Sequence, residues 1–149
     1  IIFILDVKRF REAAGTTENL IKMQAQIDAK QYGNAVVVRM EQEPGASGKI
    51  VIAHYRKVLI GLPFLGDRVT GSKDVRATPL ASYCEAGQVK LVNGRWIDPW
   101  LDELTIFPDG EHDDQVDSAS GAFNFLAGPM PSTAELLAQA ARQGQRIRS

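Results

Sequence analysis

Apolar residues of this chain fall into short runs typical of strands and into stripes at helical spacing. Residues 1–10 begin with aliphatic and aromatic side chains and end with basic ones, which predicts a strand. Apolar positions recur every three or four residues between Leu20 and Ile27, and this spacing predicts a helix that ends at Gly33. Residues 35–40 (AVVVRM) are β-branched and apolar on both faces, as expected for a central strand covered on two sides.

The same alternation continues through the rest of the chain. We expect helices over 50–59, 79–85, 99–107 and 113–126, and strands over 64–69 and 88–92. The last helix has the clearest pattern, because Val116, Phe123 and Leu126 share one apolar stripe. Strands that alternate with helices are typical of a layered domain, so the expected fold class is α/β.

Domain organisation is predicted from length and from a change in composition near the C-terminus. The 149 residues suffice for one domain with its own core. After Gly128 the sequence becomes rich in Ala and Gln, so we assign 1–128 to one domain and 129–149 to a C-terminal helix or tail. The chain starts without Met and inside an apolar run, and we interpret it as a piece of a longer protein.

Composition excludes several classes of protein. A net charge of −1, from 17 basic and 18 acidic side chains, gives no electrostatic indication of a nucleic-acid or membrane surface. No apolar run approaches the roughly 18 residues of a membrane helix. The single cysteine, Cys84, excludes a disulfide scaffold and a multi-thiolate zinc site, and we expect it to be buried and inert.

Glu41 and Glu43 form the first of two acidic clusters. Both directly follow the expected central strand. Because ligands of open α/β sheets bind beyond the carboxyl ends of strands, a carboxylate at this place is well positioned for chemistry. The alternative is a solvated loop that contains two ordinary acids.

The second acidic cluster lies in the segment 112–117 (HDDQVD). On a helix, Asp113 and Asp117 share a face, and Asp114 is displaced to one side. These carboxylates repel one another; the helix dipole offsets about 0.3–1 kcal/mol per charge, whereas a divalent cation would offset far more. The alternative is capping of the helix by Asp113, with two solvated acids behind it.

Acids from two separate elements suit a hard cation. Mg²⁺ and Mn²⁺ prefer carboxylate oxygens, and two such ions about 3.5–4 Å apart can activate a water and stabilise the leaving oxygen in phosphodiester cleavage. Glu41 at a strand end and Asp113 or Asp114 at a helix start fit that requirement. The segment 45–49 (GASGK) lacks the GxxxxGK[ST] spacing of a phosphate-binding loop, so we reject a nucleotide site there.

Three motifs, in this order, resemble one known family: EQEPGASGK at 41–49, GSKDVRATPL at 71–80 and FPDGEHDDQVD at 107–117. Together they resemble the C-terminal nuclease domain of the large terminase subunit of tailed bacteriophages. Residues 4–11 are similar to the third strand of that family, and the resemblance extends over Ile4–Leu126.

The resemblance implies a ribonuclease-H-like fold, with a mixed sheet flanked by helices. It also implies a metal-dependent endonuclease that cuts concatemeric viral DNA at the start and end of capsid filling. Glu41 would be one metal-binding acid, and Asp113 or Asp114 the acid at the start of the late helix, with Asp117 as a further candidate ligand. The implied cofactor is Mg²⁺ or Mn²⁺, with two ions in the complete site.

One departure from the family concerns its first catalytic aspartate. In the family this residue lies on a strand upstream of the one that residues 4–11 resemble. We expect that strand and the next one to be missing from this chain, so the chain alone should cut DNA weakly or not at all. Asp6 is an alternative source of the acid, although the family pattern places it on a non-catalytic strand.

The implied partners are double-stranded DNA, the portal protein, the small terminase subunit and the terminase ATPase domain, in the cytoplasm of a bacterial host and without a membrane. Cleavage without sequence preference needs phosphate contacts, for which Lys49, Lys73 and Arg76 are the candidates. A second hypothesis is a docking module that keeps the fold but mainly contacts the portal or partner subunits. A third is an unrelated metal-dependent phosphohydrolase.

Overall fold

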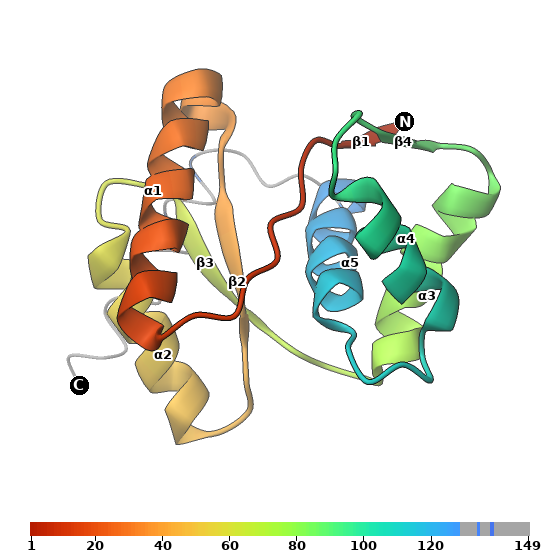
Figure 1. Cartoon of the computed structure of the whole chain (residues 1–149). Helices are drawn as coiled ribbons and strands as arrows, with labels where there is room; N and C mark the ends of the chain where they lie inside the picture. The colour runs from red at the N-terminus through yellow and green to blue at the C-terminus, as the bar shows by residue number, and fades with distance from the viewer. Residues whose placement is uncertain (129–133, 135–137, 139–149) are drawn as a thin grey trace. The chain divides into compact units, whose positions relative to one another are not determined.

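The computed structural model describes residues 1–128, 134 and 138. They form two compact units, each of which joins a two-stranded parallel sheet to helices (Figure 1). The first unit comprises residues 1–10 and 70–128, and the second comprises residues 11–69. Among the described helices, none is long and apolar enough to span a membrane.

The second unit contains two long helices and one strand pair. Its elements are α1 (Ala14–Tyr32), a 3₁₀ turn (Gly33–Ala35), β2 (Val38–Gln42), α2 (Ala46–Val58) and β3 (Phe64–Arg68). The ladder runs from Val38 opposite Phe64 to Gln42 opposite Arg68. Ala25 of α1 and Ile52 of α2 are buried in one cluster with Leu59 and Phe64. Burial of these apolar side chains therefore holds both helices to the strand pair.

The first unit is built around one helix, the segment Asp114–Ala127. Its elements are β1 (Ile2–Ile4), α3 (Lys73–Glu85), β4 (Val89–Leu91), α4 (Ile97–Ile106) and α5 (Asp114–Ala127). β1 and β4 pair in parallel over three residues. Val116 and Phe123 of α5 are buried, as are Leu80 of α3 and Trp100 of α4. The helix α5 packs against both α3 and α4, so its apolar stripe supplies the core of this unit (Figure 1).

The α/β class and the order of the elements confirm the expectation from the sequence. Both described ladders are parallel, and they form two separate pairs. The expected central strand pairs on one side only, and none of the five residues of β2 is fully buried. The assignment of 1–128 to one domain stays a prediction, and the expected tail over 129–149 lies outside the described residues except for 134 and 138.

Several elements differ in extent from the prediction, and two of them differ most. The expected strand over 1–10 forms a ladder only at Ile2–Ile4, because its partner β4 has three residues. The helix expected to begin at Pro79 begins at Lys73, and Pro79 lies inside it. Tertiary packing accounts for the earlier start, since the segment before Pro79 buries Ala77 in the core of the unit.

Candidate functional site

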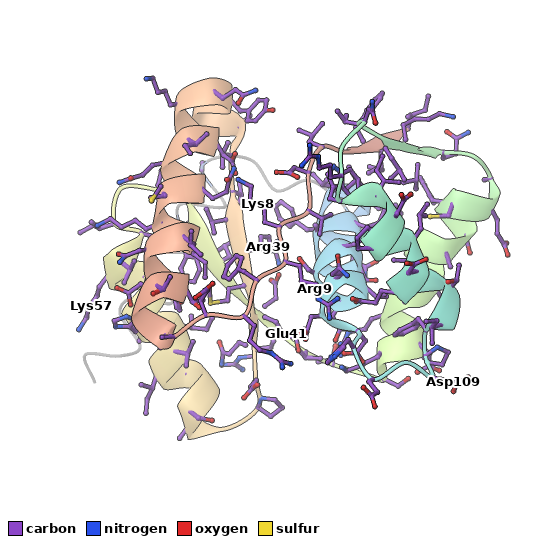
Figure 2. All side chains as sticks on the ribbon, viewed as in Figure 1. Lys8, Arg9, Arg39, Glu41, Lys57 and Asp109 are labelled. Atoms are coloured by element: carbon purple, nitrogen blue, oxygen red, sulfur yellow. The ribbon has the colours of Figure 1, made fainter. Side chains whose placement is uncertain are left out.

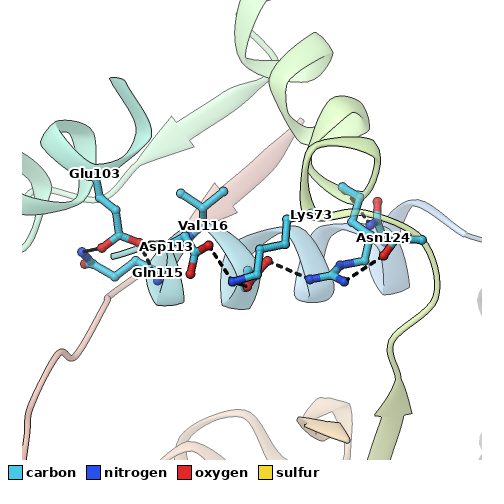
Figure 3. Close-up of polar contacts among 9 residues, drawn as sticks. Lys73, Glu103, Asp113, Gln115, Val116 and Asn124 are labelled. Atoms are coloured by element: carbon cyan, nitrogen blue, oxygen red, sulfur yellow. Dashed lines mark hydrogen bonds and ion pairs between the residues drawn. The ribbon is translucent and has the colours of Figure 1, made fainter. Parts of the chain in front are cut away.

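Lys73, a predicted DNA contact, binds two of the predicted metal ligands (Figure 3). Its ammonium Nζ lies 2.5 Å from Oδ2 of Asp113 and 3.0 Å from Oδ2 of Asp117. The hydrogen bond to Asp113, followed by the one to Asp117, raises the pKa of Lys73 above its ordinary value. The structure therefore joins the start of α3 to the first turn of α5 through one cation and two carboxylates.

Arg76 reinforces the same contact one turn further along α3. Its Nη2 donates to Oδ1 of Asp117 at 2.9 Å, so both oxygens of Asp117 face a cation. The backbone carbonyl of Arg76 accepts a hydrogen bond of 3.0 Å from the amide of Asn124. Arg76 and Asp117 are largely shielded, with 19% and 13% of their side chains exposed, whereas Lys73 is 49% exposed.

Asp113 and Asp114 occupy the first positions of α5 in different roles. Asp113 is the N-cap residue, and its carbonyl accepts the backbone N–H of Asp117 at 2.9 Å. Its side chain makes no capping hydrogen bond and contacts Lys73 instead. The alternative, in which the Asp113 side chain caps the helix and two solvated acids follow it, is therefore wrong for Asp113 and Asp117. Asp114 is the first helical residue and is exposed.

Glu103 of α4 supplies the acceptors at the start of α5. Its Oε1 accepts the backbone N–H of Gln115 at 2.7 Å and that of Val116 at 3.1 Å, and its Oε2 accepts the side-chain amide of Gln115 at 2.5 Å. Glu103 is 7% exposed. A buried carboxylate at a helix N-terminus satisfies otherwise unpaired N–H groups and is favoured by the helix dipole. Glu103 thus fixes the first turn of α5, the turn that carries Asp113 and Asp117.

Glu103 is not among the functional residues predicted from the sequence. The available signal was its position three residues after Trp100, on the apolar face of an expected helix. A carboxylate on a buried helix face needs hydrogen-bond donors from a neighbouring element, and this requirement marks it for a structural or functional role.

A cavity of about 310 Å³ lies in the first unit on another face of α5. Asp6, Gln115 and Ser118 are among its lining residues, together with apolar side chains from the N-terminal segment 2–8 and from α5. On an α-helix, Gln115 and Ser118 face away from Asp113 and Asp117. Asp6, the alternative to the expected upstream aspartate, therefore borders a different face of α5 from the pair of acids that bind Lys73.

Glu41 lies in the second unit, within β2 rather than after it (Figure 2). The prediction that Glu41 follows the strand is thus wrong, because the strand begins at Val38 and extends two residues further than expected. Glu41 is exposed, and its register partner on β3 is Asp67. Arg39, on the same face of β2, binds the carboxylate of Asp67 through both Nε, at 2.7 Å, and Nη2. Asp67 is thus a second acid beside Glu41, and it lies outside both acidic clusters predicted from the sequence.

Glu43 and Lys49 flank the start of α2, and both are exposed. Gly48, in the first turn of this helix, is buried, and a β-carbon at its position would overlap the carbonyl oxygen of Glu43. The missing side chain therefore lets the helix approach the loop 43–45 closely. The 45–49 segment therefore has a packing role at the start of α2.

The structure brings Lys73, Arg76, Asp113 and Asp117 together in one unit, and it places Glu41, Glu43 and Lys49 in the other. Within the described residues, no group of three or more His, Cys, Asp or Glu side chains is arranged to hold a metal ion. The pair formed by Asp113 and Asp117 nevertheless fits a hard cation: both offer carboxylate oxygens, and they already hold the ammonium of Lys73 between them. Mg²⁺ commonly uses one or two protein carboxylates and keeps several waters.

The chain is similar to a known protein family. A family model described as the terminase RNaseH-like domain matches residues 5–125. No curated protein and no solved structure matches the chain. The matched range includes both acidic clusters and the basic residues of α3.

Proposed function

Because the chain belongs to the terminase RNaseH-like domain family, we propose that it is the metal-dependent DNA endonuclease domain of a bacteriophage packaging terminase. The proposed substrate is concatemeric double-stranded viral DNA in the cytoplasm of the bacterial host. The proposed partners are the portal protein, the small terminase subunit and the ATPase domain of the terminase. The ribonuclease-H-like fold follows from family membership and agrees with the α/β arrangement of short parallel strands and helices within residues 1–128.

One observation carries the proposal beyond family membership. Asp113 and Asp117 extend from the first turn of α5 and hold a cation, Lys73, between their carboxylates. Glu103 of α4 fixes that turn through three hydrogen bonds. A site that must bind cations needs such a rigid pair of carboxylates, because loosely held acids would spread apart by repulsion.

The proposed ligands of Mg²⁺ or Mn²⁺ are Glu41, Asp113 and Asp114, with Asp117 as a further ligand. The bound ions would activate water and stabilise the leaving oxygen of a phosphodiester. The carboxylates would hold the ions in position, and the hydrogen bonds of Glu103 keep the first turn of α5 in place. Lys49, Lys73 and Arg76 are the proposed contacts to DNA phosphates, which position the backbone without reading its sequence.

The test is cleavage of supercoiled plasmid in Mg²⁺ or Mn²⁺, by the 149-residue chain and by a protein that continues upstream of Ile1. The longer protein should nick the plasmid, and Glu41→Gln and Asp113→Asn/Asp114→Asn should reduce nicking by about 100-fold or more, as expected for loss of a group that stabilises the transition state. Lys90→Met, at an exposed position of β4, serves as a control. Equal cutting by the parent and the acid variants would overturn the proposal.

The same assay separates the remaining hypotheses. Robust nicking by the 149-residue chain alone would contradict the prediction that an upstream aspartate is required. Activity on small phosphate esters but not on DNA would favour a different phosphohydrolase. The docking-module hypothesis relied on the helix expected after residue 129, which lies outside the described residues apart from 134 and 138.

A further inference from the structure

We infer that Lys73 is an internal counter-cation of the proposed metal site. Its ammonium pairs with the carboxylates of Asp113 and Asp117 when no divalent ion is bound, and it must leave Asp113 before such an ion can bind there. The inference rests on the proposed function, because it takes Asp113 as a metal ligand. It adds a residue that lowers metal affinity.

The contacts of the two carboxylates support this role for Lys73. The ammonium Nζ of Lys73 lies 2.5 Å from Oδ2 of Asp113 and 3.0 Å from Oδ2 of Asp117. A divalent cation bound to the same oxygens would lie within a few ångströms of the ammonium, and two cations at such a distance repel one another. The Lys73 ammonium and a divalent ion therefore compete for the carboxylate of Asp113 and cannot bind the same oxygens together.

Exposure shows which basic residue can move. Lys73 is 49% exposed and sits at the first position of α3, where its flexible side chain can turn into solvent. The side chain of Arg76 is 19% exposed and contacts Asp117 through Nη2, and the residue lies past the first position of α3. Loss of the Lys73 contact thus leaves Asp117 paired with Arg76, so α3 and α5 stay joined while Asp113 becomes available.

The partial exposure of Lys73 also limits the size of the effect. A solvent-exposed ion pair changes an equilibrium constant by about two- to fivefold. Lys73 makes two such contacts, to Asp113 and to Asp117. Removing its charge should therefore strengthen binding of a divalent ion by about 3- to 10-fold.

The experiment measures Mn²⁺ binding to the 149-residue chain by titration calorimetry. Lys73→Met should bind Mn²⁺ about 3- to 10-fold more tightly than the parent, whereas Lys73→Arg, which keeps the charge, should stay within about twofold. Lys90→Met is the matched control, since it removes one positive charge from an exposed position of the same unit. Adding Asp113→Asn to Lys73→Met should abolish the gain.

A second measurement needs no variant. When Mg²⁺ is titrated into the parent chain, the NMR signal of the Lys73 ε-methylene group should shift with the same midpoint as the backbone amide of Asp117. A purely structural ion pair would leave the lysine signal in place. An unmoved signal would therefore overturn the inference even if Lys73→Met failed to fold.

The outcomes distinguish the two proposals. If the parent and Lys73→Met bind Mn²⁺ equally while Asp113→Asn weakens binding, Lys73 is not a competing cation, yet the proposed metal site stands. If Mn²⁺ binds to none of these proteins, the inference is overturned, and plasmid cleavage by the longer protein decides the proposed function. Equal gains from Lys73→Met and Lys90→Met would reduce the effect to net charge and would also overturn the inference.

Discussion

The carboxylate of Glu103 accepts both the backbone N–H and the side-chain amide of Gln115, at 2.7 Å and 2.5 Å. The two residues come from different helices, so this pair fixes the entry of α5 against α4 (Figure 3). Side-chain capping by a residue outside the helix explains why Asp113, although at the N-cap position, is released to bind Lys73.

Loss of the Glu103 carboxylate should destabilise the first unit. Glu103→Ala leaves the N–H groups of Gln115 and Val116 without their acceptor, at a cost of about 2–4 kcal/mol in the free energy of unfolding. Glu103→Gln keeps one acceptor oxygen and should cost about half as much. Urea denaturation followed by circular dichroism measures both values. Equal stability of Glu103→Ala and the parent would contradict this capping role.

Arg39 should contribute measurably to the second unit. Its guanidinium holds Asp67 through two nitrogens, and the two side chains are only 22% and 31% exposed. Arg39→Met leaves a partly buried carboxylate without its partner, which should lower the free energy of unfolding by about 1–3 kcal/mol. Arg68→Met, at the exposed end of the same sheet, should change it by less than about 0.5 kcal/mol. Similar losses of unfolding free energy in Arg39→Met and Arg68→Met would show that the Arg39–Asp67 pair does not stabilise the second unit.

Gly48 should tolerate no side chain. In Gly48→Ala the methyl group would overlap the carbonyl oxygen of Glu43, so α2 or the loop before it must shift. We expect a loss of about 2–4 kcal/mol. The control is Gly15→Ala at the start of α1, where a β-carbon meets no atom within 4 Å and where alanine should be neutral or stabilising by up to about 1 kcal/mol. Thermal unfolding of both variants tests the contrast, which would disappear if Gly48 had free space beside it.

Cys84 should react slowly with alkylating reagents at neutral pH, although the residue is exposed. Partial burial of the thiol disfavours the thiolate and raises the pKa above the ordinary value of 9.0. Because only the thiolate reacts, the iodoacetamide rate should rise with pH and reach its midpoint above pH 9.0 in the folded chain. In urea the midpoint should fall toward the ordinary value. A folded-state midpoint at or below the one in urea would refute the prediction.

The expectation that Cys84 is buried was wrong for a reason that illustrates a limit of helical patterns. Cys84 shares the face of α3 that carries Ala77 and Leu80, both buried. It lies in the last turn, however, where residues 81–88 are all exposed. Spacing predicts which face of a helix is apolar, but the extent of that face that is covered depends on the length of the neighbouring elements.

The sequence by itself determined the local elements and the family. The apolar stripe of α5 predicted a helix over 113–126, and the structure has it at Asp114–Ala127, because periodicity at 3.6 residues is a local property. The ordered motifs around Glu41 and Asp113 likewise identified the terminase RNaseH-like family, which matches residues 5–125.

Only the tertiary structure decided the partners of the acids. Lys73 and Asp113 are 40 residues apart, and Glu103 and Gln115 are 12 apart on different helices, so no local pattern relates them. Each pair exists because burial of α5 against α3 and α4 brings the helix ends together, and charged groups near a core must then find partners. The sequence predicted that Asp113 and Asp117 form an acidic cluster. The position of the Lys73 ammonium between them follows from the packing of α3 against α5.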